Sequence, residues 1–353
     1  MPTVRTRFDS LNDLAQLPYF ELRDGVLCRA GELDPIVDVH THLALAFVRA
    51  KIVDLWASHK QTRHYLPSER SLDLDVYVNK NLLPEDLRRL KLDLGPLSVT
   101  KRGMRATHTV ANLCRDMGAL GVVRSVLLPI DFPILSKNAE AYLEVAAVEK
   151  AVISLGSVHP FARNLAAKLD AQKAAGAMGV KVHPAVQKVA PEHPKALELY
   201  RLCAERGMHV TWHCGPVGIE SLASRRLCGL GRYAKAIELS PETTFVLGHS
   251  GALEFEAGLK LAQRHEKVYL EISCQSLTNV QRVVREGPPD RILFGSDWPF
   301  YHQAIPLAKA LIATEELPEQ RANLLWKNAC RLYEVDPGVL QAHRPRDNDR
   351  SCE

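Results

Sequence analysis

The sequence predicts an α/β fold, a (β/α)8 TIM barrel with a helical insertion between the first and second strands. Short apolar runs alternate with longer segments of helical pattern from residue 36 onward, and eight such repeats are typical of a closed barrel. Several runs are nearly continuous in Val, Ile and Leu, as expected for parallel strands buried on both faces. A doubly wound open sheet is the alternative. The eight runs are Ile36–His42, Val122–Ile130, Val152–His159, Met178–His183, Met208–His213, Thr243–His249, Val268–Ser273 and Arg291–Asp297.

The segments between the runs are rich in Ala, Leu, Glu, Lys and Arg, with apolar residues at helical spacing. The clearest helical segments are Asn138–Lys150, Asn164–Ala175, Lys195–Arg206, Glu254–Arg264 and Asn279–Arg285. The interval between the first two strands departs from this regular alternation, because it is far longer than one crossover helix needs. We interpret residues 45–120 as a helical insertion at the barrel mouth, serving as a lid or an oligomer contact; an ornament on the outside is the alternative.

These elements divide the chain into three parts. Residues 1–35 form an N-terminal extension, and residues 36–340 form the barrel with its insertion. Residues 341–353 are polar and charged, which predicts a disordered tail.

Composition narrows the class of protein. The chain has 353 residues, of which 46% are hydrophobic and 24% charged, as in a globular protein with a large core. A net charge of +4 is too small to indicate a nucleic-acid or membrane partner. No apolar run approaches the ~20 residues of a membrane span, and no signal core follows the N-terminus. Eight cysteines without a CxxC pair indicate reduced thiols. We therefore expect a cytoplasmic protein with a small-molecule substrate and, by base rate, a homo-oligomer.

Histidines gather at the predicted strand ends, where the chemistry of such barrels is located. His40 and His42 lie two residues apart on a strand, so they share one face and can bind one divalent cation. Taken alone, such a pair is more often found at a surface or at the edge of a core. Only 14 histidines occur in the chain, and six of them lie within a residue or two of a strand end: His40, His42, His159, His183, His213 and His249. Chance placement explains that clustering poorly.

Six motifs follow one another in a recognisable order. They are D-x-H-x-H at 38–42, G-V-K-x-H-P at 179–184, the strand-five histidine at 213, G-H-x-G at 248–251, G-S-D-W-P at 295–299 and N-A-x-R-L-Y at 328–333. Together they resemble the amidohydrolase superfamily, in its amidohydrolase-related (amidohydrolase 2) branch, from residue 36 to about 335. That branch includes metal-dependent hydrolases and decarboxylases of aromatic or muconate-type acids.

The resemblance implies a metal centre. His40, His42 and Asp297 would bind one divalent ion, and His213 would complete the set. Three imidazoles and a carboxylate leave an open position for water, as a catalytic site requires. A bound metal lowers the pKa of that water to about 7. Zinc is favoured, and manganese, iron and nickel suit the same ligands. A metal-free barrel that binds a ligand directly is the alternative.

Asp297, His249 and Lys181 carry further implied roles. Asp297 would also accept the proton of the attacking water and pass it to the leaving group. His249 resembles the family's strand-six histidine, which binds a second metal or hydrogen-bonds the reacting water or substrate oxygen; a core histidine is the alternative. Lys181 would either be carbamylated and bridge two metals, or act as an ammonium beside a single metal. We favour one ion.

Four residues are candidates for substrate binding. His183 and His159 are expected to line the pocket, with a structural role in their His-Pro turns as the alternative. Trp298, together with Phe300, would form an apolar wall. Arg225 would hold a carboxylate, and a solvated helix face is the alternative.

The leading interpretation is a metal-dependent hydrolase that cleaves an amide, lactone or ester carbonyl of a small molecule through a metal-activated water. The alternative enzyme is a non-oxidative decarboxylase of an aromatic or unsaturated acid on the same site. The intact His-x-His of residues 40–42 favours hydrolysis, because those decarboxylases often have an altered first-strand motif. A barrel that serves only as a binding or scaffold subunit is the third interpretation, and it predicts that no metal binds.

Overall fold

A computed structural model describes residues 5–31, 34–46, 52–132 and 136–342. Each of the eight predicted apolar runs contains a strand of the barrel, so the predicted strand positions are confirmed. The strands are β4 (Ile36–Thr41), β6 (Val122–Leu127), β7 (Val152–Ser154), β8 (Gly179–Val182), β9 (His209–His213), β10 (Phe245–Gly248), β11 (Val268–Glu271) and β12 (Ile292–Leu293).

The strands pair in parallel and in chain order, and the sheet closes on itself. β4, β6 and β7 form one arc and β8 to β12 form the other. Parallel bridges join the arcs on both sides, between Gly156 and Val180 and between Thr41 and Trp298. A closed sheet in which the last strand meets the first excludes the doubly wound alternative.

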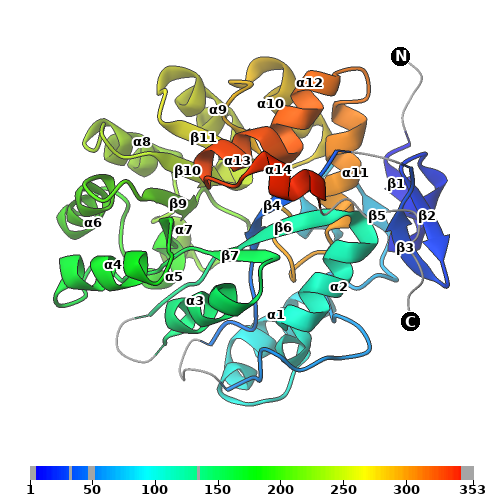
Figure 1. Ribbon diagram of the computed structural model, residues 1–353, viewed down its shortest axis with the longest axis horizontal. Coiled ribbons are helices and arrows are strands. Elements are labelled where there is room, and N and C mark those ends of the chain that lie inside the picture. Colours follow the sequence, from blue (N-terminus) through cyan, green and yellow to red (C-terminus); the bar gives the residue numbers. More distant parts are fainter. Residues whose placement is uncertain (1–4, 32–33, 47–51, 133–135, 343–353) are drawn as a thin grey trace.

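Helices surround the strands, as Figure 1 shows. The longer ones are α2 (Val110–Leu120), α3 (Asn138–Val148), α4 (Leu165–Ala174), α6 (Pro194–Ala204), α8 (Leu230–Glu238), α9 (Phe255–Arg264), α10 (Leu277–Glu286) and α11 (Ala304–Ala313). The shorter ones are α5 (Pro184–Gln187), α7 (Leu222–Arg225), α12 (Pro318–Ala322), α13 (Asn328–Leu332) and α14 (Pro337–Ala342). All five predicted helical segments are helical.

Local sequence explains these helices, and α10 is a clear case. Ser276 caps its N-terminus by accepting a hydrogen bond from the backbone N–H of Asn279, at 3.1 Å. Its buried residues are Leu277, Val280, Val283 and Val284, which recur at helical spacing and face the core.

β4 shows how the strands divide core from site. Val37 and Val39 belong to an apolar cluster that also contains Ala329 and Tyr333 near the C-terminus. Because side chains alternate along a strand, His40 lies on the other face.

The interval between β4 and β6 is less helical than expected. It contains β5 (Leu72–Asp73), the 3-10 turns η2 (Val78–Asn81), η3 (Pro96–Val99) and η4 (Met104–Thr107), and the helices α1 (Pro84–Leu94) and α2. Proline and turn residues explain this, because they interrupt helical hydrogen bonding repeatedly.

The N-terminal extension has its own small elements. They are β1 (Arg7–Phe8), the 3-10 turn η1 (Leu11–Gln16), and a hairpin of β2 (Phe20–Arg23) and β3 (Val26–Arg29). β1 pairs antiparallel with β5, so this part of the chain is tied to the interval between β4 and β6.

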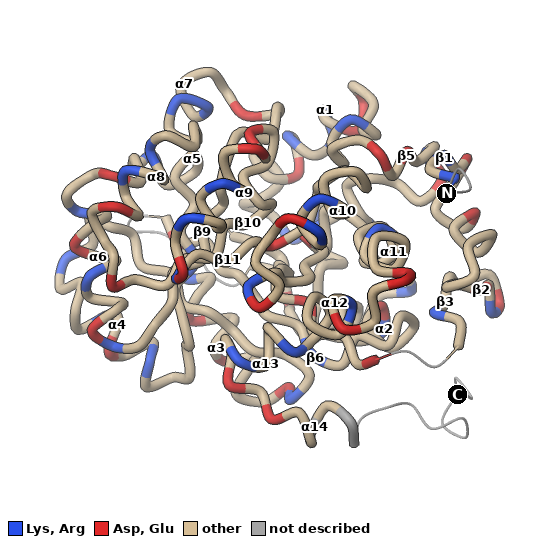
Figure 2. Tube along the Cα trace, turned by 90° about the horizontal axis from the view of Figure 1, so that it is seen from above, with Lys and Arg blue, Asp and Glu red and all other residues tan. Residues whose placement is uncertain are grey.

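The predicted tail begins two residues too early, because α14 continues to Ala342. Residues 343–353 of that tail lie outside the described residues. Figure 2 shows Lys and Arg interspersed with Asp and Glu along the outer helices. In the described part of the chain, no helix has the length and apolar character of a membrane span. Six of the described cysteines are free thiols: Cys114, Cys203, Cys214, Cys228, Cys274 and Cys330.

Candidate metal centre

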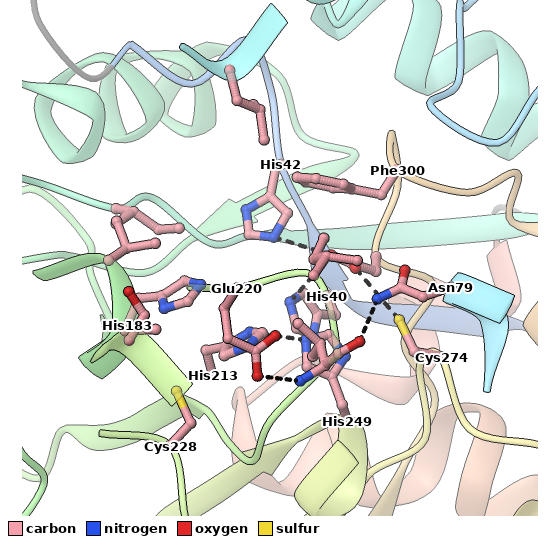
Figure 3. Close-up of a pocket in the computed structure, with 18 of the residues that line it drawn as sticks. His40, His42, Asn79, His183, His213, Glu220, Cys228, His249, Cys274 and Phe300 are labelled. Atoms are coloured by element: carbon pink, nitrogen blue, oxygen red, sulfur yellow. Dashed lines mark hydrogen bonds and ion pairs between the residues drawn. The ribbon is translucent and has the colours of Figure 1, made fainter. Parts of the chain in front are cut away.

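The strand ends bring the predicted ligands together at one end of the barrel (Figure 3). His40 and His42 come from the end of β4, and Asp297 follows β12. The Nε2 atom of His42 lies 3.3 Å from Asp297 Oδ1, and the Nε2 atom of His40 lies 3.6 Å from the same oxygen. Ligand atoms of His40, His249 and Asp297 all lie within 4.8 Å of one another. Residues far apart in the sequence therefore converge on a space that one ion could occupy.

His213 contacts this group through His249. Its Nδ1 atom is 3.2 Å from Nε2 of His249, and its ring stacks on His183 with the ring centroids 3.9 Å apart. The sequence suggested that His213 would complete the ligand set. In the structure, His249 has a ligand atom within 4.8 Å of those of His40 and Asp297, and His213 is the neighbour of His249.

Asp38, the first residue of the D-x-H-x-H motif, joins the first strand of the barrel, β4, to the segment that follows the last strand, β12. It is fully buried and accepts hydrogen bonds from the backbone N–H of Ser296 at 2.9 Å and the side chain of Gln303 at 2.7 Å. The backbone N–H of Asp297 also donates to the carbonyl of His40, at 2.8 Å. These bonds fix the loop that carries Asp297 against the strand that carries both histidines.

Two of the converging residues have an unusual backbone. Asp297 has φ of 61° and His249 has φ of 59°, in the left-handed region that non-glycine residues rarely occupy. Such conformations cost about 1–3 kcal/mol each and persist where the surroundings impose them. Here the strand-end hydrogen bonds impose them, which is typical of a functional site.

A carboxylate that the sequence analysis did not single out organises the centre. Glu271, at the end of β11, is fully buried. It accepts a hydrogen bond from Nδ1 of His40 at 2.7 Å, one from the backbone N–H of His249 at 3.0 Å, and two from Ser273. Burial raises the pKa of Glu271 to about 7, while the hydrogen bonds from His249 and Ser273 oppose that rise. A buried acid with this many donors positions its neighbours.

The hydrogen-bond pattern assigns the protonated nitrogen of each imidazole. Nδ1 of His42 lies 2.7 Å from the carbonyl of Leu128, which can only accept, so this Nδ1 carries the proton. Nδ1 of His40 donates to Glu271 in the same way. The Ser273 hydroxyl donates to Glu271 at 2.8 Å and therefore accepts from Nδ1 of His249, at 2.7 Å. Each of the three rings keeps a lone pair on Nε2.

Burial favours the neutral form of the imidazoles of His40, His213 and His249. Burial is the main cause that lowers the pKa of His213 to about 3 and the pKa values of His40 and His249 well below 6.5, with nearby Lys181 acting in the same direction. Neutral imidazole is the form that binds a metal.

The facing lone pairs provide the test of whether a metal fits. The Nε2 atoms of His40 and His42, each with a lone pair, lie 3.6 Å and 3.3 Å from one oxygen of Asp297, which also has only lone pairs to offer. Acceptors this close to one another repel, and a cation among them removes that repulsion. The donor set of imidazole and carboxylate therefore fits a divalent cation such as zinc.

Lys181 lies at the same centre. It is fully buried, and its Nζ atom is 3.4 Å from Nε2 of His40. Burial lowers the pKa of Lys181 to about 8, against the opposing effect of Asp297 and Glu271. Both roles expected for Lys181, a carbamate between two ions or an ammonium beside one, require this position.

The centre opens into a cavity of about 300 Å³. The predicted residues His40, His42, Lys181, His183, His213, His249 and Asp297 all line it. The interval between β4 and β6 also contributes to the wall, through Leu45, Tyr77, Asn79 and Leu94. Figure 3 shows Phe300 beside His42 at this wall.

Three predicted substrate-binding residues lie elsewhere. β7 ends at Ser154, so His159 falls in the following loop, where its Nε2 donates to the carbonyl of Gln187 at 2.9 Å. Trp298 is fully buried and donates its indole N–H to Asp116 at 3.0 Å. Arg225 is exposed on α7, whereas the preceding residue, Ser224, faces the cavity. None of the three lines the cavity, and the alternative stated for Arg225, a solvated face, holds.

Sequence reasoning missed Glu271 and Ser273, although a signal was present. Both lie in the seventh apolar run, and an acidic side chain inside a strand buried on both faces needs a partner. It also missed Asn79 and Glu220, which reach the cavity from segments without a motif.

The fold and the centre together describe a barrel with a group of side chains at its strand ends that could hold a metal ion. A family model described as Amidohydrolase matches residues 37–335. The chain belongs to this amidohydrolase family, as the motifs indicated, and the family consists of enzymes.

Solved structures share the fold at low identity. An uncharacterized TIM-barrel protein from Bordetella bronchiseptica is 17% identical with a TM-score of 0.58, and the match covers 85% of this chain and 98% of that one. A probable 2-pyrone-4,6-dicarboxylic acid hydrolase from Acinetobacter baumannii, with citric acid bound, is 14% identical with a TM-score of 0.53 and coverage of 85% and 99%. A 5-carboxyvanillate decarboxylase from Sphingomonas paucimobilis is 13% identical with a TM-score of 0.50 and coverage of 63% and 82%. No curated protein matches the chain.

Proposed function

We propose that this protein is a metal-dependent hydrolase that cleaves an amide, lactone or ester carbonyl of a small molecule. One observation carries the proposal: the Nε2 atoms of His40 and His42 lie 3.6 Å and 3.3 Å from the same oxygen of Asp297, and all three residues line one cavity. The intact His-x-His pair and the family membership support the same conclusion.

His40, His42, His249 and Asp297 would hold the cation, most suitably one zinc ion, with His213 and Lys181 beside them. When bound, the cation would lower the pKa of a water and polarise the substrate carbonyl. Asp297 takes the proton from the attacking water and passes it to the leaving group. Because Nδ1 of His249 donates to Ser273, its Nε2 is an acceptor, and we assign His249 to the ligand set rather than to oxyanion stabilisation.

Non-oxidative decarboxylation is the second candidate, and it has some support from the fold shared with the carboxyvanillate decarboxylase. A carboxylate substrate would need cationic partners. The described lining residues include two lysines, Lys181 beside the centre and Lys188, whose Nζ donates to the hydroxyl of Ser224, and no arginine. We rank hydrolysis first because the His-x-His pair of residues 40–42 is intact.

The test combines metal analysis with a substrate panel. We expect close to one zinc per chain, hydrolysis within a panel of lactones, esters and amides, and no CO2 release from aryl carboxylates. Asp297→Asn should abolish turnover and leave the melting temperature of the metal-free protein nearly unchanged. Asp290→Asn, which alters an exposed carboxylate, is the matched control. Full activity in Asp297→Asn, or CO2 release without any hydrolysis, would contradict the proposal.

A further inference from the structure

The cavity wall beyond the metal centre is mainly apolar. Its apolar side chains include Leu94, Ile130, Val186, Val217, Ile219 and Phe300. Two charged side chains join them away from the ligand group, Glu220 and Lys188. A volume of about 300 Å³ is at the small end of ligand pockets, so it suits a molecule of about one ring with short substituents.

Glu220 is held in this wall by its own loop. Its Oε1 atom accepts a hydrogen bond from the backbone N–H of Val217, at 3.2 Å. The carbonyl of Val217 accepts in turn from the side chain of Asn79, at 2.9 Å, which ties the loop after β9 to the insertion. Gly215 has φ of 91°, and a Cβ atom there would lie 2.0 Å from the carbonyl oxygen of Gly251, so only glycine permits this turn. Figure 3 shows the Glu220 carboxylate among the cavity side chains.

The second oxygen of Glu220 has no partner. Oε2 is buried, and no hydrogen bond reaches it. Within the described part of the chain Glu220 forms no ion pair, because Lys188 donates to the hydroxyl of Ser224 and Lys181 lies beside His40. A buried carboxylate oxygen without a donor is costly, and a ligand that supplies an N–H or O–H group removes that cost.

We infer that Glu220 determines substrate specificity: it binds a hydrogen-bond donor, a hydroxyl or an amine, on a small carbonyl compound with an apolar body. The inference rests on the proposed function, which places the substrate carbonyl at the metal centre. The same carboxylate disfavours substrates that carry a carboxylate at that position, since like charges repel. The substrate class thus differs from the dicarboxylic acid named for the Acinetobacter baumannii structure.

The experiment measures binding with ketones, which cannot be hydrolysed. The zinc-loaded protein is titrated calorimetrically with acetophenones that carry a hydroxymethyl, a methyl or a carboxylate group at ring position 3 or 4. At one of the two positions, the hydroxymethyl ketone should bind at least about tenfold more tightly than the methyl ketone, as a hydrogen bond to a charged acceptor predicts. The carboxylate ketones should bind at least about tenfold more weakly than the methyl ketones.

Two variants and one control locate the effect. Glu220→Gln should abolish the discrimination against carboxylate, and Glu220→Leu should also abolish the preference for hydroxymethyl. Glu238→Gln, which removes an exposed carboxylate on α8, should leave the wild-type order unchanged. The inference is overturned if no hydroxymethyl ketone binds at millimolar concentration, if carboxylate ketones bind as tightly as methyl ketones, or if Glu220→Leu keeps the preference.

Binding and catalysis fail separately in this design. If the binding order holds and no lactone, ester or amide is hydrolysed, the proposed function is wrong and the Glu220 subsite stands. If hydrolysis is found and the binding order fails, the inference about Glu220 is wrong and the hydrolase stands.

Discussion

Replacing Glu271 by glutamine tests the organisation of the metal centre most directly. The carboxylate receives four hydrogen bonds, from Nδ1 of His40, the backbone N–H of His249, and the N–H and hydroxyl of Ser273. Glutamine has the same size but only one acceptor oxygen, and its NH2 group would face donors. Two hydrogen-bonding paths to this carboxylate keep the proton on Nδ1, one directly from His40 and one from His249 through the Ser273 hydroxyl. Glutamine would break at least one of them.

The expected magnitude follows from comparable carboxylate–histidine–metal arrangements, where loss of the outer carboxylate weakens metal binding about 10–100-fold. That range corresponds to roughly 1.4–2.7 kcal/mol of binding free energy. The free energy of unfolding of the metal-free protein should change less than this. Glutamine loses hydrogen bonds, but it also removes a charge whose burial raises the pKa of Glu271 to about 7.

The assay is competition for zinc against a fluorescent chelator at pH 7.5, with the melting temperature of the metal-free protein measured in parallel. Glu266→Gln, an exposed residue just before β11, is the matched control and should bind zinc as the wild type does. Ser273→Ala should weaken zinc binding less than Glu271→Gln does. It removes the hydroxyl that links His249 to Glu271, but it leaves the hydrogen bond from His40 to Glu271. Zinc affinity within twofold of the wild type in Glu271→Gln would refute the reasoning.

Two further predictions concern the centre and its surroundings. His249→Ala should reduce zinc affinity more than His213→Ala does, because His249 has a ligand atom within 4.8 Å of those of His40 and Asp297, whereas His213 contacts His249. Equal losses in the chelator assay would contradict this order. Burial raises the pKa of Asp131 to about 7, above its usual value near 4, so the folded state favours the protonated form. The contribution of Asp131 to stability is therefore full below about pH 4 and is lost as the pH rises toward 7. Asp131→Asn should make the free energy of unfolding fall less between pH 4 and pH 7 than it does in the wild type. If urea titrations show that the free energy of unfolding changes equally with pH in the variant and the wild type across that range, Asp131 does not titrate as described.

The sequence predicted the framework of this enzyme better than the outer parts of its site. Strands buried on both faces consist mainly of apolar residues, so β4 and the other strands of the barrel could be recognised as apolar runs. His40, His42 and Asp297 were visible because histidine is scarce and the barrel fold sends strand ends to one place.

Whether certain other residues reach the cavity could not be predicted from the sequence, for physical reasons. Whether a loop residue turns inward depends on where its strand ends, and β7 ends too early for His159 to reach the cavity. On the single turn of α7, Ser224 faces the cavity and the next residue, Arg225, does not. Glu220 lies in a loop whose path depends on Gly215 and on a hydrogen bond from Asn79, and both are matters of tertiary packing.

The hydrogen bond between Asn79 and Val217 links the insertion to the loop after β9 across the cavity wall. Under our proposal for Glu220, two stretches of chain that are remote in sequence determine substrate choice together. A chimera that received the insertion of another family member would place a new surface against a β9 loop that fits a different insertion. The proposal therefore implies that exchanging the insertion alone would not transfer specificity.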